Sequence, residues 1–187
     1  MNFLSKEKLP NILTWSRVWM IPIIALLVVT PGAWTHYLSA ALFCLVALTD
    51  WLDGYLARKW QVQSNFGAFL DPVADKLLVV VLLILLAVQA PGILMILSVL
   101  IIVSREIVIS ALREWMAGMG MRDVVQVAPI GKLKTTLQMI ALLFLLVAEA
   151  GTAVFSIGLT LLVLAAAVTL VSMIQYLLAA AGSLTSN

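Results

Sequence analysis

The sequence predicts an all-α integral membrane protein with six transmembrane helices, from its composition, the lengths of its apolar stretches and the placement of its charges. Apolar residues make up 64% of the 187 residues, and the mean hydropathy is +1.14, whereas a soluble domain is roughly half apolar. A helix needs about 20 mainly apolar residues to cross the hydrocarbon core of a bilayer. The chain is therefore expected to form a single membrane domain over residues 1–187, with no separate soluble domain.

Six apolar stretches follow one another along the chain. Pro31-Gly32, Pro91-Gly92 and Gly151-Thr152 predict three short turns, and the other two connections are longer and polar. The last stretch carries no charge from Ala153 to Met173, so we expect it to lie at the periphery or against another subunit. The expected helices cover about residues 12–30, 37–57, 72–89, 92–113, 131–149 and 153–178.

The basic residues predict the orientation of these helices. All eleven lie in or beside the N-terminal arm at 1–11, the second connection or the fourth. Because cytoplasmic segments of membrane proteins are enriched in lysine and arginine, we expect the arm, both termini and the two long connections in the cytoplasm. The net charge of +2 is too small to indicate a nucleic-acid partner.

Two of the apolar runs are too short to span a membrane without including charged residues. The run at 37–49 is followed by Asp50, and the run at 93–103 is soon followed by Arg105, although a span needs about 20 residues. Ionisable groups at such depth are costly unless they face water and pair with one another. The sequence therefore predicts a polar cavity that is open to the cytoplasm.

Four aspartates flank the second connection at helical spacings. Asp50 and Asp53 are three residues apart, and Asp71 and Asp75 are four apart, so each pair lies on one helix face. A loop over 59–70 would let the chain turn back and bring the two pairs together. Clustered carboxylates repel one another unless cations neutralise them, and ligands that are all oxygen favour Mg²⁺ or Mn²⁺ over zinc. These four residues are the predicted metal ligands.

Small and basic residues beside the aspartates indicate a phosphate ligand. Gly54 and Ala57 lie on the helix face of the first aspartate pair, where they leave room for a ligand near the backbone. Arg58 adds a forked phosphate-binding group, and Gly67 is expected to relieve the turn before the second pair. Carboxylates, a divalent metal and a guanidinium together favour a phosphate ester or pyrophosphate as substrate and phosphoryl transfer as reaction.

Residues 50–75 resemble the signature of the CDP-alcohol phosphotransferase family, with all eight defining positions at the family's spacing: Asp50-x2-Asp53-Gly54-x2-Ala57-Arg58-x8-Gly67-x3-Asp71-x3-Asp75. Other stretches are similar to the bacterial phosphatidylglycerophosphate synthase branch of that family. They are Pro10-Asn11-Ile12-Leu13-Thr14 with Arg17, Ser104-Arg105-Glu106-Ile107, and Gly131-Lys132-Leu133-Lys134-Thr135-Thr136. The resemblance thus extends along nearly the whole chain.

The resemblance implies the substrates, the cofactor and the roles of the site residues. The donor would be CDP-diacylglycerol, the acceptor sn-glycerol 3-phosphate and the leaving group CMP. Two Mg²⁺ or Mn²⁺ ions would be held by the four aspartates, and Asp75 would also be the general base. The cytidine nucleotide would contact Gly54, Ala57, Arg58 and Gly67. The family comparison further implies a homodimer in the bacterial inner membrane, with the active site facing the cytoplasm and the lipid substrate reached from the bilayer.

The phosphate of the acceptor needs a cationic site of its own. Arg105 and Arg113 are eight residues apart, which places them roughly on one helix face, and Glu106 and Glu114 are expected to orient them. The alternative interpretation is that such bases only set the topology or contact lipid headgroups. We expect a subset of five bases to bind the acceptor phosphate: Arg17, Arg105, Arg113, Lys132 and Lys134.

Two other functions remain open from the sequence. A related enzyme using inositol phosphate or another alcohol would suit the extra bases equally well, and only the flanking stretches favour glycerol phosphate. A divalent-cation transporter also places acidic residues in a membrane. Against it, charges occur only in the inner halves of the expected helices, which leaves no polar relay to the opposite side, and no half of the sequence repeats the other.

Overall fold

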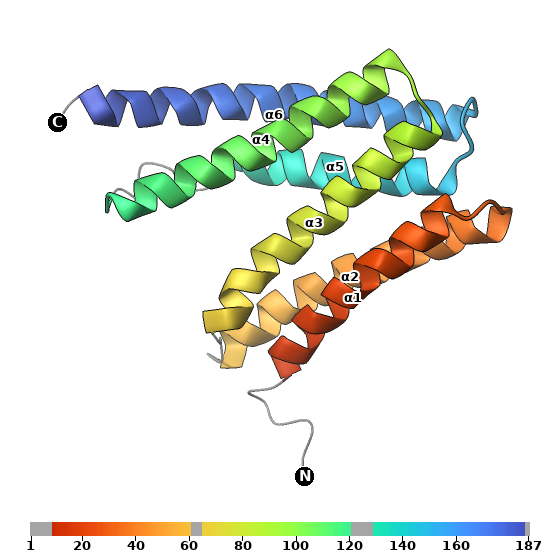
Figure 1. Cartoon of the computed structure of the whole chain (residues 1–187), viewed down its shortest axis with the longest axis horizontal. Helices are drawn as coiled ribbons and strands as arrows, with labels where there is room; N and C mark the ends of the chain where they lie inside the picture. The colour runs from red at the N-terminus through yellow and green to blue at the C-terminus, as the bar shows by residue number, and fades with distance from the viewer. Residues whose placement is uncertain (1–8, 61–64, 121–128, 186–187) are drawn as a thin grey trace, which may run out of the picture. The chain divides into compact units, whose positions relative to one another are not determined.

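The computed structural model of the chain is helical. It describes the backbone of residues 9–60, 65–120 and 129–185, and the side chains of 15–50, 70, 73–120 and 133–182. These residues form no strand and six helices (Figure 1), namely α1 (Leu9–Val29), α2 (Ala33–Trp60), α3 (Asn65–Gln89), α4 (Ile93–Gly118), α5 (Pro129–Val147) and α6 (Ala153–Thr185). The all-α class predicted from the sequence is confirmed.

The three short turns lie where the proline and glycine pairs predict them. α1 and α2 are joined by residues 30–32, α3 and α4 by 90–92, and α5 and α6 by 148–152. Gly151 has a φ of 89°, a conformation that glycine adopts without the steric cost of a side chain. Turn chemistry read from the sequence therefore fixes three of the helix boundaries to within a few residues.

The connection between α2 and α3 is shorter than predicted. We expected a loop over 59–70, but α2 continues to Trp60 and α3 begins at Asn65. Gly67 alone interrupts an apolar run at 66–70, and one glycine costs a helix only about 1 kcal/mol. Gly67 therefore lies inside α3 rather than in a turn before it.

The chain divides into two compact units. The first comprises Met1–Gln89 with Leu146–Ala148, and the second comprises Ala90–Leu145 with Glu149–Asn187. In the described part of the first unit, α1 packs against both α2 and α3; in the second, α4 packs along α6 (Figure 1). In the first unit the packing is therefore centred on α1, and in the second the recorded packing joins α4 to α6.

Both α1 and α4 carry an arginine on their buried face. Positions three or four residues apart lie on one side of a helix. Among the described side chains of α1, the buried ones are Arg17, Ile21, Ile24 and Val28. On α4 they are Met95, Ser98, Val99, Ile102, Arg105, Ile109 and Met116. Each arginine thus continues the line of the apolar core of its own unit.

The opposite faces of these helices are apolar and exposed. Trp19 and Leu26 of α1 are 68% and 66% exposed, and Ile107 of α4 is 66% exposed, whereas an exposed helix face in a water-soluble protein is usually polar. Within the described residues, α4 over Ile93–Gly118 and α6 over Ala153–Gly182 are long and apolar enough to cross a membrane. Such surfaces suit contact with lipid tails.

Helix α6 is more closely integrated than its lack of charge predicted. It packs along α4 rather than standing apart, and it also approaches α5 closely at Gly158. A Cβ atom at Gly158 would lie 3.0 Å from both Cγ of Leu145 and Cβ of Phe144. Ser172 and Tyr176 of α6 are buried, whereas other α6 residues such as Leu164 and Leu178 are exposed, so the expectation that α6 lies at the periphery or against another subunit stays a prediction.

Candidate functional site

Arg17 joins two of the predicted metal-binding aspartates. Its Nη2 lies 2.8 Å from Oδ1 of Asp50 on α2, and its Nη1 donates to Oδ1 of Asp75 on α3 at 2.9 Å. The arginine side chain is 1% exposed, whereas the two carboxylates are 44% and 45% exposed. One buried guanidinium therefore holds together the carboxylates of Asp50 and Asp75, which lie on two helices and are 25 positions apart in the sequence.

The helices themselves aim the two carboxylates at α1. Asp50 lies four residues after the buried Val46, and Asp75 lies three residues before the buried Leu78, so each aspartate shares a helix face with a core residue. Because α1 packs against both α2 and α3, its buried face meets both aspartates. Arg17 is the residue of that face at the level where they lie.

The remaining residues of the signature lie on the same two helices. Asp53, Gly54, Ala57 and Arg58 belong to α2, and Gly67 and Asp71 belong to α3. Their side chains lie outside the described residues, so their predicted roles as metal ligands and nucleotide contacts stay predictions. The prediction that the two aspartate pairs converge is supported by one described contact from each pair, through Arg17.

The Asp50 and Asp75 pair fits a divalent cation by its donor chemistry. Both groups are carboxylates, the ligands that Mg²⁺ and Mn²⁺ prefer, and both Oδ1 atoms already face one cationic group within 2.9 Å. Their exposure of nearly one half leaves the carboxylates accessible from outside the helix packing. The arrangement is thus compatible with a metal ion shared by α2 and α3.

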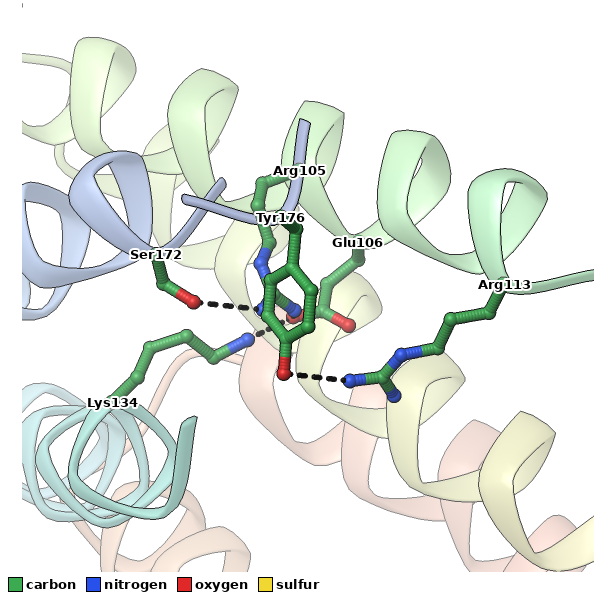
Figure 2. Close-up of polar contacts among 6 residues, drawn as sticks. All are labelled: Arg105, Glu106, Arg113, Lys134, Ser172 and Tyr176. Atoms are coloured by element: carbon green, nitrogen blue, oxygen red, sulfur yellow. Dashed lines mark hydrogen bonds and ion pairs between the residues drawn. The ribbon is translucent and has the colours of Figure 1, made fainter. Parts of the chain in front are cut away.

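A second polar cluster, which we call the basic cluster, lies within the other unit. Figure 2 shows three bases converging from α4 and α5 around residues of α6. Lys134 forms an ion pair with Glu106, and Nη1 of Arg105 lies 3.3 Å from the same Oε1 atom of Glu106. The basic cluster consists of Arg105, Glu106, Arg113, Lys134, Ser172 and Tyr176.

Two side chains of α6 complete the basic cluster. Nη2 of Arg105 donates to Oγ of Ser172 at 3.3 Å, and Nη2 of Arg113 donates to the hydroxyl of Tyr176 at 3.2 Å. The Tyr176 ring also lies beside both guanidiniums, with its centroid 5.8 Å from Cζ of Arg105 and 5.3 Å from Cζ of Arg113. These distances are within the range of cation–π attraction.

Positive charge exceeds negative charge in the basic cluster. Among the described residues, its three bases face one carboxylate, that of Glu106. Arg105 and Lys134 are only 5% and 4% exposed, so water does little to screen them. In addition, Nε of both Arg105 and Arg113 is buried without a hydrogen-bond partner among the described residues. Buried donors without acceptors favour the binding of an anion.

The structure sorts the five predicted acceptor bases. Arg105, Arg113 and Lys134 come together in the basic cluster, and Arg17 lies in the other unit beside Asp50. The side chain of Lys132 lies outside the described residues. Three of the five bases are therefore neighbours.

Of the two glutamates expected to orient Arg105 and Arg113, only the first is found beside its arginine. Glu106 does contact Arg105, but Glu114 is exposed and its carboxylate contacts no described side chain. Arg113 is bonded to Tyr176 instead. Sequence reasoning missed Ser172 and Tyr176; the signal available was their spacing of four residues, which places both hydroxyls on one face of α6.

Fold and site together define a helical protein with two helices apolar enough to cross a membrane and, among the described residues, an acidic pair and a basic cluster. Residues 7–180 match the CDP-alcohol phosphatidyltransferase family. The chain belongs to this family.

Curated relatives are similar over nearly the full length. A protein from Salmonella choleraesuis (strain SC-B67) is 47% identical over 182 residues, covering 94% of this chain and 96% of the relative. One from Escherichia coli (strain K12) is 46% identical with the same coverage, as is one from Shigella flexneri serotype 5b (strain 8401) over 176 residues. All three are named CDP-diacylglycerol--glycerol-3-phosphate 3-phosphatidyltransferase.

Proposed function

We propose that this chain transfers the phosphatidyl group of CDP-diacylglycerol to sn-glycerol 3-phosphate, giving phosphatidylglycerophosphate and CMP. The observation that carries the proposal is the identity of 46% to 47%, over 94% of the chain, with relatives named for this reaction. That coverage includes both the acidic motif on α2 and α3 and most of the basic cluster. The geometry adds that an acidic and a basic cluster exist in the same chain, as a nucleotide donor and a phosphorylated acceptor require.

The proposed metal ligands are Asp50, Asp53, Asp71 and Asp75, with two Mg²⁺ or Mn²⁺ ions. When bound, such ions would offset the charge of the pyrophosphate of the donor and of the departing CMP. The support is the contact of Asp50 and Asp75 with one cationic group and the oxygen-only donor set. We assign the cytidine nucleotide to Gly54, Ala57, Arg58 and Gly67, as the family signature implies.

Asp75 is the proposed general base. The 1-hydroxyl of the acceptor forms a bond to the lipid-bearing β-phosphorus as the bond from that phosphorus to the CMP oxygen breaks, and the hydroxyl proton passes to the Asp75 carboxylate. Asp75 is suited to this because its side chain is 45% exposed and thus within reach of a substrate. Phosphorus passes directly between two oxygens, so no covalent enzyme intermediate is needed.

The acceptor phosphate is assigned to Arg105, Arg113 and Lys134, the three bases of the basic cluster, with Lys132 kept as a further candidate from the sequence. Guanidiniums bind phosphate through parallel hydrogen bonds, and the unpartnered Nε atoms of Arg105 and Arg113 leave donors available. The excess of positive charge favours a phosphorylated alcohol over an uncharged one.

For Arg17 the contacts favour a different role from the one expected. Both of its terminal nitrogens are engaged by Asp50 and Asp75. We propose that Arg17 holds these two carboxylates side by side and offsets their repulsion, while its binding of the acceptor phosphate stays a prediction from the sequence.

We further propose that both units form the single membrane domain predicted over 1–187, with six spans, a polar cavity open to the cytoplasm and both termini on that side of the bacterial inner membrane. Support comes from the exposed apolar faces of α1 and α4 and the confinement of all eleven bases to one side of the predicted topology. A homodimer is proposed on the family comparison alone.

The test uses purified full-length protein in detergent with CDP-diacylglycerol and Mg²⁺. Glycerol 3-phosphate, inositol phosphate, serine and glycerol are supplied one at a time, and CMP and the lipid product are both quantified. We expect equal amounts of CMP and phosphatidylglycerophosphate with glycerol 3-phosphate alone. A lipid product with inositol phosphate instead would establish the related enzyme, and cation uptake into sealed vesicles without CMP would establish a transporter.

A further inference from the structure

The charge-free helix α6 contributes to the site through two hydroxyl-bearing side chains on one face. Ser172 and Tyr176 are four residues apart, and they are 0% and 6% exposed. Each accepts a hydrogen bond from a different arginine of α4, at 3.3 Å for Ser172 and 3.2 Å for Tyr176. Figure 2 shows Arg105 behind the Tyr176 ring and Arg113 bonded to its hydroxyl.

We propose that Tyr176, assisted by Ser172, is a positioning residue that sets the spacing and direction of the two guanidiniums for a phosphate monoester. The inference rests on the proposed function, because the ligand it concerns is the phosphate of the acceptor. It adds a determinant of acceptor affinity on a helix that carries none of the family signature.

Like charge makes such a positioning residue necessary. Two guanidiniums that share one anion repel each other in its absence, and long side chains lose considerable rotamer freedom when they are held in place. The ring of Tyr176 attracts both cations, with Cζ distances of 5.3 and 5.8 Å. Its hydroxyl accepts a hydrogen bond from Nη2 of Arg113. The rigid ring of Tyr176 thereby restricts the positions of the two flexible arginine side chains.

The ring itself is held by apolar contacts. Tyr176 belongs to a buried cluster with Ile109, Met116 and Ala180, against which Leu112 and Met173 also pack. Ile109 lies midway between Arg105 and Arg113 on α4, so the same helix turns that carry the arginines also clamp the ring. The position of the ring is therefore set by packing and does not depend on a bound anion.

The arginines keep donors for a ligand after these contacts are made. Ser172 and Glu106 engage the two terminal nitrogens of Arg105, and Tyr176 engages Nη2 of Arg113. Nε of each arginine is buried without a partner among the described residues. A phosphate oxygen that accepts from these donors would also neutralise the excess positive charge.

The test measures KM for glycerol 3-phosphate and for CDP-diacylglycerol separately, together with kcat and the thermal unfolding temperature. Tyr176→Phe keeps the ring and its packing but removes the acceptor for Arg113. We expect KM for glycerol 3-phosphate to rise about three- to ten-fold, the range of one ordinary hydrogen bond, while KM for CDP-diacylglycerol changes less than about two-fold. Tyr176→Leu, which also removes the ring face, should raise the acceptor KM further.

Two further variants separate positioning from packing. Thr169→Val removes a buried hydroxyl from the same helix, one that has no described hydrogen-bond partner, and it should leave both KM values within about two-fold. Arg113→Lys removes the nitrogen that donates to Tyr176, so Tyr176→Phe should have less than about a two-fold effect in that background.

The outcomes distinguish this inference from the proposed function. If Arg105→Lys and Arg113→Lys leave the acceptor KM unchanged, the assignment of the acceptor phosphate is wrong. If those variants raise it but Tyr176→Phe does not, or if Tyr176→Phe lowers only the unfolding temperature, the positioning role is wrong. Additive effects of Tyr176→Phe and Arg113→Lys would overturn it as well, because a residue that acts through Arg113 cannot be independent of it.

Discussion

Arg17 on α1 and Arg105 on α4 occupy equivalent places in the two units but have opposite charge environments. Both lie on the buried face of their helix. Arg17 is one cation between two carboxylates, whereas Arg105 shares the single carboxylate of Glu106 with Lys134 and lies near Arg113. The first site has excess negative charge and the second excess positive charge.

The difference shows that a buried arginine can be part of a site for a cation or of a site for an anion. In each unit a buried guanidinium is held by partners from neighbouring helices, and the balance of the surrounding charges decides what else can bind. Excess carboxylates favour a divalent cation, and excess bases favour a phosphate. The predictions below test this contrast, beginning with the largest expected effect.

Replacing Asp75 by Asn should give the largest loss. The amide cannot accept the proton of the acceptor hydroxyl, so kcat for CMP release should fall about 10²- to 10⁴-fold, the usual contribution of a general base. Glu149→Gln is the matched control, because that carboxylate is exposed at the turn before α6. Normal activity in Asp75→Asn would remove the assigned base.

Replacing Glu106 by Gln should test the excess charge of the basic cluster. The change leaves Arg105 and Lys134 buried without their carboxylate partner, and breaking a buried ion pair costs about 3 to 5 kcal/mol of unfolding free energy. Thermal unfolding in detergent measures the loss. Inorganic phosphate should restore more stability to this variant than to the parent, because an added anion substitutes for the missing charge.

Glu114→Gln is the control for that experiment. Glu114 follows Arg113 as Glu106 follows Arg105, but it is exposed, so its loss should change the free energy of unfolding by less than about 0.5 kcal/mol. Equal effects of the two substitutions would contradict the charge balance described for the basic cluster.

Replacing Arg17 by Gln should test the charge balance at Asp50 and Asp75. The variant loses the counter-ion of Asp50 and Asp75, and with it the repulsion between the guanidinium and a bound metal ion. Mn²⁺ should therefore bind about ten-fold more tightly, corresponding to about 1.4 kcal/mol. Electron paramagnetic resonance measures this binding. Turnover should fall because the carboxylates are less well placed. Arg17→Lys should have a Mn²⁺ affinity and a turnover between those of the parent and of Arg17→Gln, since an ammonium cannot donate to both carboxylates as the forked guanidinium does.

The same variants decide between the two roles considered for Arg17. A counter-ion of the aspartates should leave KM for glycerol 3-phosphate within about two-fold. A rise in that KM with no change in Mn²⁺ affinity would return Arg17 to the acceptor phosphate, as the sequence suggested.

The smallest effect is expected at Gly158, where α6 meets α5, the helix that carries Lys134. A Cβ at this position would lie 3.0 Å from Leu145 Cγ and 3.1 Å from the Leu145 backbone nitrogen, so Gly158→Ala should destabilise the protein by about 1 kcal/mol. In Gly182→Ala the added Cβ meets nothing within 4 Å. That control should be neutral or slightly stabilised, because alanine favours the helix.

The sequence was sufficient for the helices and for part of the acidic site. Apolar lengths and the proline and glycine pairs located α1 to α6, because both signals are local. The spacing of Asp50, Asp53, Asp71 and Asp75 placed each pair on a helix face. The loop expected over 59–70 was wrong because Gly67 was read as a turn, although a single glycine does not end a helix.

The partners of the charged residues could not be predicted in the same way. Arg17 meets Asp75 across 58 positions, and Arg113 meets Tyr176 across 63, and no local pattern encodes such distances. Tyr176 and Ser172 carry no charge, so nothing in the sequence distinguished them from other polar residues of an apolar helix. The charge of a residue indicated that it needed a partner, but only the packing of α4 against α6 identified it.

The buried arginines also fix how their helices can be turned. Trp19 and Leu26 lie on the exposed side of α1, away from Arg17, and Ile107 lies on the exposed side of α4, away from Arg105. One residue corresponds to a rotation of about 100°. In a bilayer, rotating α1 or α4 about its axis by that amount would move a guanidinium toward the lipid tails. Each arginine therefore restricts its helix to one rotational orientation.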